Sequence, residues 1–248
     1  MNAAAAGYLA DLTASIGELV DRQPEAVARA AEVFAGAIEG KGAVHVYDTG
    51  HMIAHELVAR TGGLVAFTRL EFSGQVGDGP LGMESRRVSS DPEVAAARLI
   101  EWLFAQRTIQ QPDVLLLSSV SGVSVSVVEL AIQARARGIG VVALTSVEFS
   151  SRLPARHSSG HRLLDVADVV LDNLAPYGDA TQALSGLEAR LCPLSGVAGA
   201  ALLWAIVAET TRLLLARGVA PSVYPSINLP DGPARVDVVE AHYRETGQ

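Results

Sequence analysis

Five short apolar runs constrain the fold of this chain more than any other feature of its sequence. Each run is followed by a turn, and most are then followed by a segment with helical spacing. The runs cover residues 43–47, 64–67, 114–117, 141–144 and 169–171. Residues 114–117 (VLLL) are apolar throughout, which is typical of a strand buried on both faces. Strands that alternate with helices favour parallel pairing, because parallel strands need crossover connections. The pattern predicts an α/β fold: a doubly wound, five-stranded parallel sheet with helices on both faces.

The helical segments have clear periodicity and boundaries. Residues 3–21 place Leu9, Leu12, Ile16 and Leu19 on one face of a helix. Pro24 suits the start of a second helix over residues 25–39. Further helices are expected over residues 51–60, 92–110, 124–137, 161–165 and 197–217. No linker or internal repeat divides the chain, so we expect a single domain over residues 1–248 with a helical extension over about residues 1–40.

Composition excludes several classes of function. The chain of 248 residues has a formal net charge of −8, and aromatic residues make up only 5% of it. A negative chain repels the phosphate backbone, so we expect no nucleic-acid partner. The single Cys192 excludes an intramolecular disulfide, and the N-terminus lacks the basic segment of a signal peptide. The apolar stretch over residues 197–208 is too short to span a bilayer. We therefore expect a cytoplasmic protein without a membrane partner.

Two predicted strand-to-helix turns carry small polar residues: residues 48–51 (DTGH) and residues 118–124 (SSVSGVS). In an open parallel sheet such turns line the ligand crevice, and a helix N-terminus there offers N–H groups to an anion. Helix capping alone needs one hydroxyl, whereas the second turn has four serines. The predicted phosphate contacts are Ser119, Ser121, Gly122 and Ser124, with Thr49 and Gly50 in the first turn. Neither turn has the glycine pattern of an ATP or NAD site, so no cofactor is expected.

These motifs resemble the sugar isomerase (SIS) domain family. The resemblance rests on the order of elements, the Thr-Gly-His turn at residues 49–51, and the S-x-S-G-x-S pattern of residues 119–124. It covers about residues 25–220, and residues 156–160 (RHSSG) and 166–173 (VADVVLDN) place the chain among uncharacterised members near the phosphoheptose isomerases. It implies a flavodoxin-like fold and a phosphosugar bound by the serine-rich turn. Met52 departs from the family, in which Ser often follows the first Gly or His, and this removes a hydroxyl from the first turn.

Isomerising an aldose phosphate to a ketose phosphate needs a base and an acid. Phosphoheptose isomerases carry a catalytic Glu in a His-x-x-Glu-Glu-Leu segment, and the resemblance implies this role for Glu56. His157 lies in a long loop where we expect it to be exposed and suited to shuttling protons. His51 stands at the first turn and suits a hydrogen bond to a sugar hydroxyl or the phosphate. The alternatives are a solvated helix glutamate for Glu56 and a surface histidine for His157.

Four more residues are candidates for contacting the substrate: Thr145, Ser146, Asp172 and Asp179. The two aspartates lie near the end of the fifth strand, although aspartate is equally common in turns. The pairs His51/His55 and His157/His161 have helical spacing that could suit a metal. No cysteine or aspartate cluster completes such a sphere, so no metal is expected.

Three classes of function follow. The first is a phosphosugar isomerase, or a lyase resembling the N-acetylmuramic acid 6-phosphate etherases. The second is a phosphosugar sensor without catalysis, and the third is a structural protein. A DNA-bound regulator is disfavoured, because residues 1–40 hold only Arg22 and Arg29 as positive side chains. The apolar helix over residues 197–217 suits a subunit interface, and the family resemblance adds the expectation of a homodimer or homotetramer.

Overall fold

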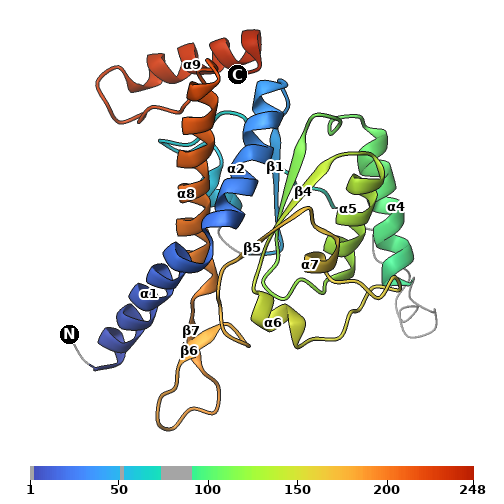
Figure 1. The fold of residues 1–248 in the computed structure, drawn as a ribbon, viewed down its shortest axis with the longest axis vertical. Coiled ribbons are helices and arrows are strands. Elements are labelled where there is room, and N and C mark those ends of the chain that lie inside the picture. Colours follow the sequence, from blue (N-terminus) through green and yellow to red (C-terminus); the bar gives the residue numbers. More distant parts are fainter. Residues whose placement is uncertain (1–2, 51–52, 74–90) are drawn as a thin grey trace, which may run out of the picture.

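A five-stranded parallel sheet forms the centre of the molecule (Figure 1). The computed structural model describes residues 3–50, 53–73 and 91–248. The strands are β1 (Val44–Asp48), β2 (Phe67–Arg69), β3 (Val114–Ser118), β4 (Gly140–Thr145) and β5 (Val169–Asp172). Their spatial order is β2-β1-β3-β4-β5, so the direction of winding reverses between β1 and β3. The predicted α/β sheet is confirmed, and its switch point lies between the two polar turns.

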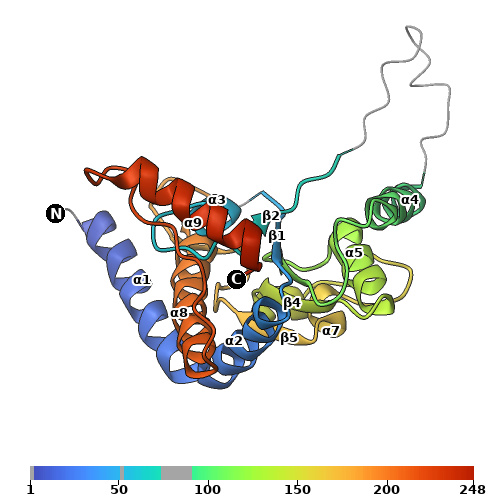
Figure 2. The same ribbon diagram turned by 90° about the horizontal axis from the view of Figure 1, so that it is seen from above.

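Helices cover both faces of the sheet. Successive strand residues point to opposite faces, so a strand buried on both faces contributes side chains to two apolar clusters. Val114 and Leu116 of β3 join one apolar cluster, whereas Leu115 and Leu117 join the other. The first cluster packs against α1 (Ala3–Arg22), α2 (Pro24–Glu39), α3 (Ile53–Leu57) and α8 (Ser195–Ala216). The second packs against α4 (Pro92–Ala105), α5 (Val125–Ala136) and α7 (Leu163–Val166). Figure 2 shows these two layers on opposite sides of the strands.

Several helix boundaries follow from residues that the sequence marks. Asp91 caps α4, since its Oδ1 accepts a hydrogen bond from the backbone N–H of Glu93 at 2.9 Å. Pro24 occupies the first position of α2, where its missing N–H costs no intrahelical bond. Gly138, with φ +73°, follows the last turn of α5. The predicted starts of α2 and α4 and the predicted end of α5 are therefore confirmed.

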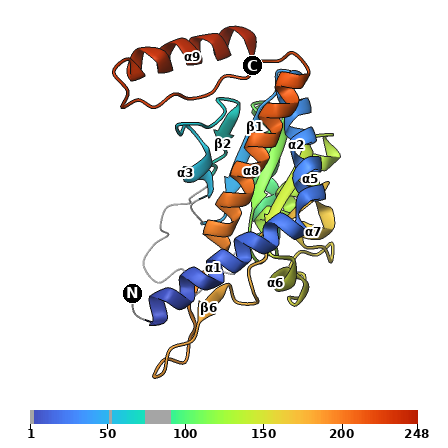
Figure 3. The same ribbon diagram turned by 60° about the vertical axis from the view of Figure 1, so that its left-hand side comes forward.

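Other elements differ from the prediction. The second strand was expected over residues 64–67 but runs from Phe67 to Arg69, because Leu64 instead forms an antiparallel bridge with Val223. The helix expected over residues 51–60 is described only as the short α3. Four elements lie in segments expected to be irregular or given no helix: α6 (Val147–Ser151), β6 (Ala180–Gln182), β7 (Leu191–Pro193) and α9 (Gly232–Thr246). Figure 3 shows the β6–β7 hairpin and α9 at opposite ends of the molecule.

The C-terminal segment runs beside the connection between α3 and β2. The backbone N–H of Val65 donates to the carbonyl of Ser222, and the N–H of Tyr224 donates to the carbonyl of Gly63. Beyond α9, the Gln248 side chain donates to the carbonyl of Glu39 at the end of α2. The last residues of the chain are thus attached to its first half.

Helix α8 is the most apolar element of the fold. By length and composition alone it is long enough to cross a membrane, and 44% of its most apolar window is buried in the protein. It packs chiefly against α2. Its remaining surface borders an apolar groove shared with α2, lined by Pro24, Val27, Ala205 and Ala208 among others. The subunit interface expected at α8 stays a prediction, as does the oligomeric state.

Candidate functional site

The two polar turns meet at the carboxyl edge of the sheet. Asp48, the last residue of β1, pairs in register with Ser118, the last residue of β3. The next residue, Thr49, donates both its backbone N–H and its hydroxyl to the Ser118 carbonyl, at 3.1 and 3.2 Å. These bonds hold the first turn, which leads to α3, directly beside the second turn, which leads to α5.

Gly122 gives the second turn its shape. Its φ is +62°, which is the left-handed region that favours glycine. A Cβ at this position would lie 3.0 Å from the Ser150 hydroxyl oxygen and 3.2 Å from that of Thr145. The Gly122 carbonyl accepts a hydrogen bond from the N–H of Leu163 at 2.8 Å. Both the backbone conformation and the close packing therefore require glycine here.

The second turn ends in a helix N-terminus with spare hydrogen-bond donors. Within the part of the chain that the structure describes, no protein acceptor bonds the backbone N–H groups of residues 120–127. Ser124 is the N-cap of α5, yet its hydroxyl makes no capping bond and instead lies 3.1 Å from the Ser126 hydroxyl. Free N–H groups, two hydroxyls and the dipole of a 12-residue helix together favour an anion.

The first turn is different, because a carboxylate already occupies its helix N-terminus. The Asp48 Oδ2 accepts hydrogen bonds from the backbone N–H groups of Ile53 at 2.9 Å and Ala54 at 3.4 Å. A second negative group is disfavoured beside this carboxylate. Thr49 and Gly50 stay predicted phosphate contacts, and the longer run of spare donors among the described residues lies in the second turn. His51 lies outside the described residues.

Glu56, the predicted base, faces α8. The indole N–H of Trp204 donates to its Oε1 at 3.2 Å, and the Arg60 guanidinium pairs with its Oε2 at 3.1 Å. A quarter of the Glu56 side chain is exposed. Its catalytic role stays a prediction, although both carboxylate oxygens already have partners within the chain.

A small polar cavity opens at the carboxyl ends of β1 and β2. Its volume is about 130 Å³, and its lining comes from β1, the first turn, α3 and the end of β2. The polar side chains in it are Asp48, His55, Arg69 and Glu71. Arg69 and Glu71 form an ion pair at 3.1 Å. Arg69 and Glu71 were not predicted from the sequence, although their place at the end of a strand was the available signal.

His157 is buried, so the prediction of an exposed loop histidine was wrong. Its Nε2 lies 2.9 Å from the Glu129 Oε2 on α5. The backbone N–H of Ser159 donates to its Nδ1 at 3.1 Å. A backbone N–H can only donate, so Nδ1 carries no proton and Nε2–H donates to Glu129. Both nitrogens of His157 are therefore engaged.

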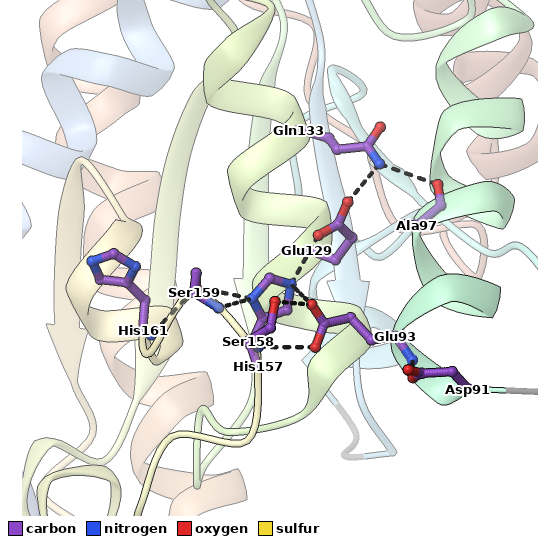
Figure 4. Close-up of polar contacts among 9 residues, drawn as sticks. All are labelled: Asp91, Glu93, Ala97, Glu129, Gln133, His157, Ser158, Ser159 and His161. Atoms are coloured by element: carbon purple, nitrogen blue, oxygen red, sulfur yellow. Dashed lines mark hydrogen bonds and ion pairs between the residues drawn. The ribbon is translucent and has the colours of Figure 1, made fainter.

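The same cluster ties two helices to the loop that carries His157. Ser158 donates its hydroxyl and its backbone N–H to the Glu93 carboxylate on α4, and these bonds hold the pKa of Glu93 below its usual range. The Gln133 amide donates to Glu129 at 2.7 Å and to the Ala97 carbonyl at 3.1 Å, linking α5 to α4. The network fixes the loop in place (Figure 4). Among the described residues, no group of three His, Cys, Asp or Glu side chains has the arrangement of a metal site.

Thr145 and Ser146 are fully buried and bonded to the backbone. The Thr145 hydroxyl donates to the Val120 carbonyl at 3.0 Å, and that of Ser146 donates to the Ala175 carbonyl at 2.6 Å. Thr145 thus holds the backbone of the second turn in place through the Val120 carbonyl. Their roles as substrate contacts stay predictions.

Asp172 and Asp179 hold helix starts. Asp172 accepts the N–H groups of Val147 and Leu174, both at 3.0 Å, and so provides an acceptor for the first N–H group of α6. Asp179 accepts hydrogen bonds from the backbone N–H of Ser195 at 2.8 Å and from its hydroxyl at 2.6 Å, and so holds the first residue of α8. These bonds favour the turn alternative over a sugar contact, which stays a prediction for both.

Comparison with known proteins agrees with this geometry. The model of a family described as the SIS domain matches residues 7–146, more than half of the chain. The chain belongs to the SIS-domain family. The matched region of this SIS protein contains both polar turns and the predicted base.

Relatives and solved structures extend the match to nearly the whole SIS chain. A UPF0309 protein of Brucella anthropi is 35% identical over 96% of this chain and 95% of its own. A UPF0309 protein of Shouchella clausii is 28% identical over 92% of this chain and 91% of its own. A phosphoheptose isomerase from Neisseria gonorrhoeae aligns with a TM-score of 0.50 at 17% identity, over 84% of this chain and 96% of its own. The sugar isomerase domain of an RpiR transcription factor from Sphaerobacter thermophilus aligns with a TM-score of 0.50 at 16% identity, over 98% of this chain and 99% of its own. At such identities the two structures establish the fold alone.

Proposed function

We propose that the chain binds the phosphate of a phosphorylated sugar at the N-terminus of α5 and converts an aldose phosphate into a ketose phosphate. The observation that carries the proposal is the run of backbone N–H groups over residues 120–127 that has no protein acceptor within the described part of the chain. A phosphate oxygen is the acceptor that such a helix N-terminus favours.

The electrostatics of the turn suit a small anion and not a polyanion. The chain has a net charge of −8, so its overall field repels nucleic acid. The attraction to phosphate comes from backbone dipoles and from the hydroxyls of Ser121 and Ser124, which act only at short range. A single phosphate group on a neutral sugar meets this requirement.

Isomerisation is the proposed reaction by analogy of fold, since one solved structure with this fold is a phosphoheptose isomerase. A phosphosugar sensor is the second candidate. The observation that favours a sensor is that Glu56 and His157, the acid–base groups selected from sequence, both have internal partners. A lyase is the third candidate, and its products distinguish it from an isomerase.

Binding is tested by calorimetry with inorganic phosphate, glucose 6-phosphate and glucose. We expect both phosphates to bind and glucose to fail. The Ser121→Ala variant should bind both phosphates about 5–10-fold more weakly, because it loses a hydrogen bond worth about 1–1.5 kcal/mol. Ser185→Ala is the matched control, since Ser185 is exposed at the tip of the β6–β7 hairpin. Wild-type protein that binds neither phosphate would contradict the proposal.

The reaction is tested by NMR with a panel of hexose, heptose and pentose phosphates and an N-acetylhexosamine phosphate. An isomerase converts one of them into its ketose or aldose partner with no change in mass. A lyase releases a fragment, and a sensor returns every compound unchanged.

A further inference from the structure

Among the described residues, His55 is an acid–base group at the carboxyl edge of the sheet whose side chain reaches a cavity beside the first polar turn. It lies on α3 and lines the 130 Å³ cavity together with Asp48, Gly50 and Arg69. Its side chain is exposed. In the described parts of the chain, no residue forms a hydrogen bond or an ion pair with its imidazole. Its nitrogens are therefore open to a ligand in the cavity.

The two acid–base groups selected from sequence lack this property. Both oxygens of Glu56 are engaged by Trp204 and Arg60. Both nitrogens of His157 are engaged by Glu129 and Ser159. His55 is the neighbour of Glu56 on the same short helix, but it lines the cavity, whereas Glu56 contacts α8.

The cavity lies at the right place for the reacting end of a sugar phosphate. Asp48 lies in the cavity wall and is the register partner of Ser118, the residue at which the second turn begins. Paired strands are about 4.8 Å apart. A sugar phosphate is longer than this spacing, so a sugar with its terminal phosphate at α5 can extend its opposite end toward the cavity. In an aldose phosphate that end carries C1 and C2, between which the proton moves.

We infer that His55 is the catalytic base of the isomerisation, an inference that rests on the proposed function. The imidazole takes the proton from C2 of the aldose, and the electrons of the C–H bond form the C1=C2 double bond. The C1 carbonyl oxygen gains a proton, which gives the enediol. The imidazolium then returns its proton to C1, and the C2 hydroxyl loses its proton as the C2 carbonyl forms. No oxidant or second substrate takes part.

Arg69 lies in the same cavity as His55. About a third of its side chain is exposed, and its ion pair with Glu71 uses only part of the guanidinium. The remaining N–H groups can donate to the carbonyl oxygen and stabilise the charge that develops on it. The cavity thus supplies both a proton acceptor and a donor for the carbonyl.

The test compares His55→Gln with Glu56→Gln and with His161→Gln, a matched control at an exposed histidine outside the cavity. Calorimetry with inorganic phosphate and glucose 6-phosphate measures binding. Proton NMR in D₂O measures exchange at C2 across the sugar phosphate panel.

We expect His55→Gln to bind inorganic phosphate within about twofold of wild type and to lose about 100-fold or more in the rate of exchange. His161→Gln should behave as wild type. Glu56→Gln should keep most of the exchange, since its amide oxygen still accepts from Trp204.

Two results would overturn the inference and leave phosphate binding in place. One is full exchange in His55→Gln with loss of exchange in Glu56→Gln. The other is wild-type protein that binds sugar phosphates but catalyses no exchange at C2. Wild-type protein that binds neither phosphate would remove the proposed function and the role of His55 together.

Discussion

The two turns at the carboxyl edge share a hydroxyl residue, a glycine with positive φ and a following helix, yet they differ at one register position. The first has Asp48 where the second has Ser118. The Asp48 carboxylate bonds the N-terminus of α3. Ser118 is buried and uncharged, and in the described part of the chain the N-terminus of α5 has no such internal acceptor.

The comparison shows that a turn with a glycine of positive φ and a following helix are not sufficient for an anion site. The helix N-terminus must also lack an internal anion. The Asp48 carboxylate at the end of β1 accepts hydrogen bonds from two N–H groups of α3. The residue at the same position in β3, Ser118, is neutral. The identity of the last strand residue therefore determines whether a negative charge already lies at the N-terminus of the helix that follows.

The largest expected effect on stability distinguishes Gly122 of the second turn from Gly50 of the first. Gly122→Ala should lower the free energy of unfolding by about 2–4 kcal/mol, because it adds both backbone strain and contact with the Ser150 and Thr145 hydroxyls. Gly50→Ala should lower it by about 1–2 kcal/mol through strain alone, since the added methyl group would meet no atom of the described residues within 4 Å beyond its chain neighbours. Urea denaturation measures both values. Equal losses would show that the close packing under the second turn is unimportant.

A smaller effect is expected at the first turn. Asp48→Ala removes the acceptor for two N–H groups of α3 and should lower the free energy of unfolding by about 1 kcal/mol. Asp48→Asn keeps an acceptor and should lose only a few tenths of a kcal/mol. Calorimetry should find the affinity of both variants for inorganic phosphate unchanged or up to about twofold tighter, since a nearby negative charge is gone. Loss of phosphate binding in Asp48→Asn would contradict the comparison.

The smallest effect on stability is expected at the second turn. Ser124→Ala should change the free energy of unfolding by less than about 0.5 kcal/mol, because the Ser124 hydroxyl makes no capping bond. The same change should weaken the binding of inorganic phosphate about 3–10-fold. Thermal unfolding and calorimetry on one preparation give both numbers. A stability loss as large as that of Asp48→Ala would mean that the Ser124 hydroxyl serves the helix and not a ligand.

The sheet was predictable because its signals are local. The run VLLL at residues 114–117 and the turn that follows it depend on neighbouring residues alone. Gly122 was predicted for its place in a motif, and the structure adds the reason, a left-handed conformation packed against two hydroxyls. The order of strands then brings the two turns together at the switch point.

The orientation of the candidate site residues was not predictable, because distant residues determine it. His157 lies in a sequence that resembles a surface loop, and its burial depends on Glu129, 28 residues earlier in the chain. The direction of Glu56 depends on Trp204, 148 residues away. Helix α9 was missed after a Pro/Gly-rich segment, although Pro233 near its start was a usable signal.

The bridge between Leu64 and Val223 has a consequence for the order in which the protein is made. Residues 62–65 leave the ribosome early, but their partners Ser222 and Tyr224 follow only after most of the remaining chain, a delay on the order of ten seconds during synthesis. For that time the backbone beside β2 has no partner and presents an open edge to other nascent chains. Pairing at this edge is thus a late step in the folding of the chain, and the edge is exposed to other chains until it is complete.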